Sequence, residues 1–137
     1  LAVGQMMMLG ELEYHKDNYP LAFAHLRESV RRCDSLDYSE PWPWMHPPRH
    51  ALGALLLEQV HYAEAEKVYR ADLGLNDTVV RCAQHWANIW ALHGLVECLK
   101  HRKATDELEK LQPRLDNAVL LADTSITSSC CCRKNVM

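Results

Sequence analysis

The chain has 137 residues, the usual length of one domain, and its 48% hydrophobic and 24% charged residues are ordinary for a globular protein. A formal net charge of −3 gives no electrostatic reason to expect a nucleic acid or an acidic membrane as partner. The longest apolar runs, such as residues 54–57, are far shorter than the roughly 20 residues of a transmembrane helix. The six cysteines are not spaced like a disulfide framework, which favours a reducing, intracellular location.

Helical periodicity dominates the first half of the chain. Hydrophobic residues recur there every three or four positions, so we expect two pairs of helices. The predicted helices span about residues 3–16, 19–33, 49–60 and 62–73. Pro20 falls in the first turn of the second helix, where its missing N–H costs little. Residues 34–48 contain four prolines and should form a loop, because a residue before proline avoids helical geometry.

The second half of the chain continues the helical pattern less regularly. We expect a turn at 74–79 and a fifth helix over about 80–101. A sixth helix should begin near Ala104 and be broken or kinked at Pro113. The remaining residues, 122–137, are rich in Ser, Thr and Cys and are predicted to form an irregular tail.

A small residue recurs in the middle of the first helix of each predicted pair. Leu9-Gly10, Leu52-Gly53 and His93-Gly94 hold equivalent places. A glycine at such a place lets two antiparallel helices approach closely, because no side chain projects between them. Large residues around it, such as Leu26 and Tyr69, would fill the space beside that contact.

The stretch 52–69, from Leu-Gly to Val-Tyr, closely resembles a tetratricopeptide repeat. The segments 47–58 and 90–95 also resemble the C-terminal part of longer tetratricopeptide proteins. This resemblance implies an all-α, right-handed α-solenoid of about three antiparallel helix pairs, with units at about 3–35, 46–74 and 80–112. They would form one repeat domain over 1–121, and each pair would bury its apolar face by stacking on a neighbour.

The resemblance also implies a concave groove that binds a protein or peptide. In the family register the groove would be lined by Met7, Glu11, His50, Ala54, Leu57, Ala91, Leu95 and Cys98. Such a mostly apolar lining favours an apolar or amphipathic helix of a partner. The alternative is that the tail buries these residues.

The loop of Trp42, Trp44 and neighbouring prolines is the most unusual local composition. Rigid aromatic side chains are favoured anchors of protein interfaces, which makes both tryptophans candidate partner-binding residues. The alternative is that the loop folds over the first two helix pairs and caps their cores.

A metal or redox site is the competing interpretation. His46 and His50 are four residues apart, and Cys130 and Cys132 form a Cys-x-Cys pair that could supply thiolates to copper or zinc. His85, His93 and His101 recur every eight residues and would share one helix face. Surface histidines and an inert or acylated tail are the alternatives.

No nucleophile motif or phosphate-binding glycine loop is present, so an enzyme is not expected. The sequence as a whole favours a non-enzymatic scaffold or a subunit of a larger complex. No cofactor is expected unless copper or zinc occupies the competing site.

Overall fold

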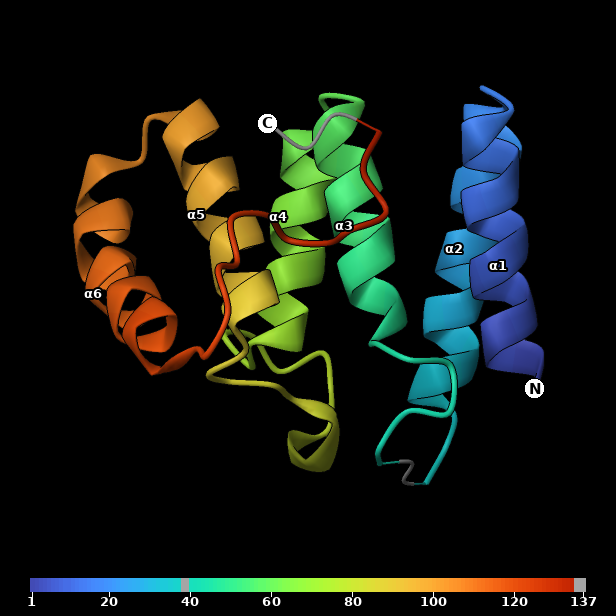
Figure 1. Cartoon of the computed structure of the whole chain (residues 1–137), viewed down its shortest axis with the longest axis horizontal. Coiled ribbons are helices and arrows are strands. Elements are labelled where there is room, and N and C mark those ends of the chain that lie inside the picture. The colour runs from blue at the N-terminus through green and yellow to red at the C-terminus, as the bar shows by residue number, and fades with distance from the viewer. Residues whose placement is uncertain (38–39, 135–137) are drawn as a thin grey trace.

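Every regular element in residues 1–37 and 40–134, the part described by the computed structural model, is a helix (Figure 1). The helices are α1 (Ala2–His15), α2 (Tyr19–Asp34), α3 (Pro48–Glu58), α4 (Tyr62–Asp72), α5 (Ile89–Arg102) and α6 (Thr105–Leu121), with a short 3₁₀ helix, η1 (Arg81–Ala83), before α5. The predicted all-α class is therefore confirmed. The tail residues 135–137 and the loop residues 38–39 lie outside the described residues.

The first four helices agree with the predicted ranges to within about two residues at each end. Their boundaries follow from local chemistry that a sequence displays directly. Pro20 lies at the start of α2, and Pro48 is the first residue of α3, where each ring fits the first helical turn. Asp17 and Val60, in the turns after α1 and α3, both adopt positive φ, which ends the helical path.

One expectation for the second half of the chain is wrong, and one of the two alternatives given for Pro113 is excluded. The fifth helix begins at Ile89 and not near residue 80, because residues 81–88 form η1 and an irregular connection. The sixth helix is not broken at Pro113, which lies inside the continuous helix α6. Pro113 is exposed, so the carbonyl that loses its helical hydrogen bond can be hydrated.

Each helix packs against the next one along the chain, from α1 to α6. Helix α3 also contacts α1 and α5, so these three helices lie next to one another as well. This order gives the molecule a helical-repeat-like, all-α character that is visible in the row of helices of Figure 1. Among the described residues no helix combines the length and hydrophobicity that crossing a membrane requires.

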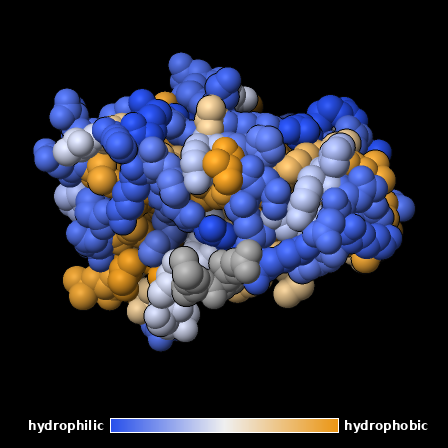
Figure 2. All heavy atoms as spheres, turned by 90° about the horizontal axis from the view of Figure 1, so that it is seen from above, coloured by the Kyte–Doolittle hydropathy of each residue, from blue (hydrophilic) through white to orange (hydrophobic). Residues whose placement is uncertain are grey.

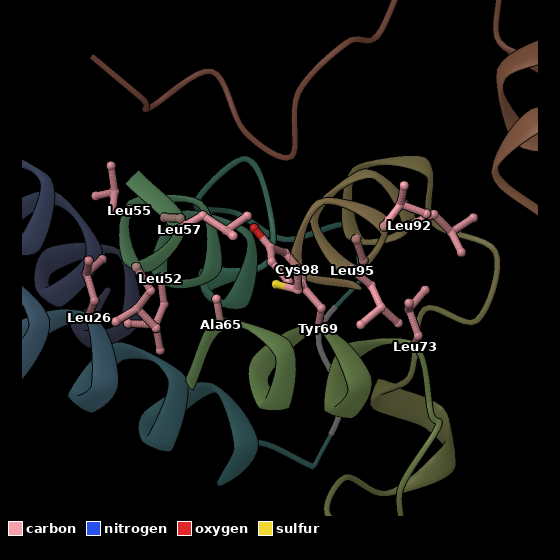
Figure 3. Close-up of a cluster of buried hydrophobic side chains, with 14 of the residues drawn as sticks. Leu26, Leu52, Leu55, Leu57, Ala65, Tyr69, Leu73, Leu92, Leu95 and Cys98 are labelled. Carbon is pink, nitrogen blue, oxygen red and sulfur yellow. The ribbon is translucent and has the colours of Figure 1, made fainter. Parts of the chain in front are cut away.

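Helix α3 is the centre of the core. Every residue from Pro48 to Leu57 is buried, as is typical of a helix surrounded by protein on all sides. The core around it is built mainly from leucines of α2, α3 and α5 and from Leu73 just after α4, together with Tyr69 and Cys98 (Figure 3). Burial raises the pKa of the Cys98 thiol to about 12, so this cysteine is an uncharged core residue.

The three mid-helix glycines make the close helix contacts. A Cβ added to Gly10 would lie 2.5 Å from Cγ of Leu26, and one added to Gly53 would lie 2.5 Å from Cζ of Tyr69. A Cβ added to Gly94 would also collide with the Tyr69 ring. Tyr69 of α4 is therefore wedged between α3 and α5, and Gly94 contacts the preceding helix pair.

Candidate functional site

The chain's own tail crosses the helices from which the resemblance predicts a groove. Residues 122–134, called the C-terminal tail below, leave α6 and cross α5, α4 and α3 in the view of Figure 1. Ser129 is fully buried, and its Oγ accepts a hydrogen bond of 2.8 Å from the Tyr69 hydroxyl. Burial raises the pKa of Tyr69 well above its usual value, so its phenol remains a donor.

The tail ends on three acidic side chains. Arg133 donates two hydrogen bonds, of 2.8 and 3.1 Å, to the carboxylate of Glu97 on α5. The backbone N–H of Lys134 donates to Glu58 at the end of α3, at 3.2 Å. The Lys134 ammonium donates to Asp17 in the turn after α1, at 2.6 Å. These contacts hold the tail across a span from α5 to the first helix pair.

Most of the predicted groove residues are not accessible. The seven residues other than Glu11 are buried in the core or beneath the tail: Met7, His50, Ala54, Leu57, Ala91, Leu95 and Cys98. Glu11 is half-buried, and burial raises the pKa of its carboxyl. A partner could reach this face of α3 and α5 only if the tail moved away.

A second, open groove lies between α1 and the Trp/Pro loop. Met8 and Leu12 of α1 and Met45 of the loop are exposed, Met8 to 64% and Met45 to 89%. Together with Leu1 and Trp44 they line a groove of about 910 Å³, called the α1–loop groove below. The face of the molecule seen in Figure 2 is mostly hydrophilic, with hydrophobic side chains gathered in separate places.

The two tryptophans of the loop have different surroundings. The Trp42 ring packs edge-on against the His85 ring, with centroids 4.9 Å apart. Trp42 therefore packs against the connection before α5. Trp44 packs against the core and borders the α1–loop groove. Of the two proposed anchors, only Trp44 therefore faces this groove, and the exposed Met45 beside it was not singled out from the sequence.

A buried carboxylate flanked by two imidazoles lies at the other end of the core. Asp72 of α4 is fully buried; one oxygen lies 3.1 Å from Nε2 of His50, and the other 2.9 Å from Nδ1 of His85. Burial alone would raise the pKa of Asp72. The hydrogen bonds and charges of the two histidines outweigh this effect and lower the pKa to about 2. The group joins α3, α4 and the connection before α5.

The predicted metal residues are only partly brought together. Nε2 of His46 lies 3.9 Å from Sγ of Cys130, and Cys130 is joined to Cys132 by a disulfide. His50 directs Nε2 to Asp72, as described above. No group of three or more His, Cys, Asp or Glu side chains in the described ranges is placed to hold a metal ion.

The three histidines spaced eight apart do not share one helix face. His85 lies in the connection before α5, whereas His93 and His101 belong to the helix. Burial lowers the pKa of His93, which also has a backbone hydrogen bond to Ile126 of the tail. His101 stacks on Tyr62 with ring centroids 4.1 Å apart.

Two features of these sites escaped sequence reasoning. Asp72 follows Ala65 and Tyr69 at helical spacing on the apolar face of α4, and a charged residue at such a position was the available signal. The exposed Met8 carried no comparable signal, because it lies in the uninterrupted apolar run of residues 6–9.

Comparison with protein-family models, with curated proteins and with solved structures found no match for this chain.

Proposed function

We propose that this protein is a non-enzymatic interaction module of the tetratricopeptide kind, a scaffold or assembly subunit that binds an apolar or amphipathic segment of a partner protein. In this proposal the six helices are three stacked pairs of a right-handed α-solenoid. The recurrence of glycine at the middle of α1, α3 and α5 supports it, since each glycine permits a close helix contact.

The observation that carries the proposal is the α1–loop groove. Methionine and tryptophan supply large contact areas, and flexible methionines adapt to different apolar partners. Exposed apolar grooves rimmed by polar residues often mark sites where a protein binds a partner. A helix that presents apolar residues at positions i, i+3, i+4 and i+7 would match a groove bordered by helix α1.

The test is a comparison of captured partners. Met8→Asp combined with Met45→Asp places two charges in the groove, and should reduce partner recovery from cell extract at least tenfold. The matched control is Val80→Asp with Leu121→Asp, two residues of comparable exposure outside the groove, and it should recover the same partners as the wild type. Identical recovery by both double variants would show that the groove is not the binding surface.

A further inference from the structure

The C-terminal tail is held in its groove by a hydroxyl and two basic residues at fixed spacing. Ser129 is hydrogen-bonded to the buried Tyr69. Arg133 is paired with Glu97, and Lys134 with Asp17. Ser129, Arg133 and Lys134 come from one irregular segment with a turn at Cys131–Cys132, and their partners come from α4, α5 and the turn after α1. The tail is thus seated as a peptide ligand would be.

The acidic residues that contact the tail are complementary in charge to its two basic residues. Glu97, Glu58 and Asp17 are acidic and come from three different parts of the fold, yet the same two consecutive basic residues contact all of them. The hydrogen bond from Lys134 lowers the pKa of Asp17, so this carboxylate is charged when the tail is bound. An acidic segment in the same place would meet three like charges.

The contacts also suggest how firmly the tail is held. The ion pair of Lys134 with Asp17 is solvent-exposed, and exposed ion pairs contribute little to stability in salt. A tether keeps the tail at a local concentration on the order of millimolar, so weak contacts are enough to keep the groove filled. A free segment of the same chemistry that binds more tightly can therefore displace it.

We propose that this groove is a second binding site, specific for a basic segment of a partner protein that carries a hydroxyl residue four positions before an Arg–Lys pair, with a turn between them as in the tail. The C-terminal tail is the tethered occupant of this site, and the partner segment replaces it. The site is separate from the α1–loop groove, so either proposal can fail without the other.

The probe for this proposal is a fluorescent synthetic peptide of residues 123–134, with the Cys130–Cys132 disulfide formed and serine in place of Cys131. Its affinity for the full chain is measured by fluorescence anisotropy. The wild-type chain should bind it weakly because the tail competes. The variant Arg133→Glu/Lys134→Glu should bind at least tenfold more tightly, since its own tail is repelled by Glu97, Glu58 and Asp17.

Two controls separate recognition from a general charge effect. The variant Arg81→Glu/Lys110→Glu makes the same change in net charge at exposed positions away from the groove, and should bind the peptide like the wild type. A peptide with glutamate at both basic positions should bind none of the chains. Adding Glu97→Gln to the tail variant should reverse the gain in affinity.

A measurement on the wild-type chain alone covers the case in which the tail variant does not fold. Excess peptide should raise amide hydrogen exchange in residues 126–134 and leave α3 protected. Unchanged exchange, or equal peptide affinity of the wild type and the tail variant, would overturn the proposal. A tail variant that sediments as a dimer and gains no affinity for the peptide would instead assign the groove to a second copy of the chain.

Discussion

At the scale of single residues, the packing of Tyr69 against two glycines controls stability. Alanine is preferred over glycine inside a helix by about 1 kcal/mol, so Gly53→Ala would stabilise an isolated α3. In the folded protein the new methyl group would lie 2.5 Å from the Tyr69 ring, which cannot retreat because Gly94 is close on its other side. Overpacking typically costs about 1–3 kcal/mol.

We therefore expect Gly53→Ala to lower the free energy of unfolding by about 1–2 kcal/mol, measured by urea denaturation. A double-mutant cycle with Tyr69→Leu provides the control, since the smaller side chain should make the added methyl group harmless. If Gly53→Ala raised stability, helix propensity would outweigh the contact, and the helix spacing described here would be wrong.

The sequence predicts that these three glycines allow close helix contacts, but it predicts only some of the residues that they contact. Gly10 and Gly53 contact the second helix of their own pair, as their positions predict. Gly94 contacts Tyr69 of the preceding pair, because α5 packs directly against α4. That contact depends on how α5 packs against α4. A repeat pattern within α5 and α6 therefore could not predict it.

At the scale of elements, α5 depends on a cap that α2 lacks. The Asn88 side chain accepts hydrogen bonds from the backbone N–H groups of Trp90 and Ala91, at 3.0 and 3.2 Å. Asn18 precedes α2 in the same way but makes no such bond. Asn88→Ala should therefore lower the free energy of unfolding by about 1 kcal/mol, whereas Asn18→Ala should change it by only a few tenths. Equal losses in thermal unfolding would contradict this assignment.

The same element shows where periodicity fails. The residues before Asn88 are compatible with a helix, yet the backbone N–H of His85 donates to the carbonyl of Asp72 at 2.6 Å, and its ring binds the Asp72 carboxylate. These contacts fix the connection in an irregular path. They join residues from separate elements, so local propensity could not predict them, whereas α1 to α4 begin and end at local signals.

At the scale of the whole molecule, the tail determines which surface is free. The residues predicted to line the groove are largely buried, most of them in the hydrophobic core, and an irregular segment from the end of the chain packs over Tyr69. A sequence shows that such a segment is not helical but not where it docks. The open surface is instead the α1–loop groove, whose exposure depends on the loop lying beside α1.

The buried Asp72 group should make the stability of the whole molecule depend on pH. The folded pKa is about 2, below the usual value of 3.8, so this contribution is present above pH 4 and is lost as the pH falls towards 2. A shift of this size corresponds to a contribution on the order of 2 kcal/mol. Asp72→Asn removes the titrating group but keeps its size, so the stability difference between wild type and variant should shrink between pH 5 and pH 2.5.

Urea denaturation at each pH measures this difference. Carboxylates that titrate in both proteins, such as Glu28, contribute equally to both and do not affect the difference. A constant difference across this range would show that Asp72 does not hold α3, α4 and the connection before α5 together through its charge.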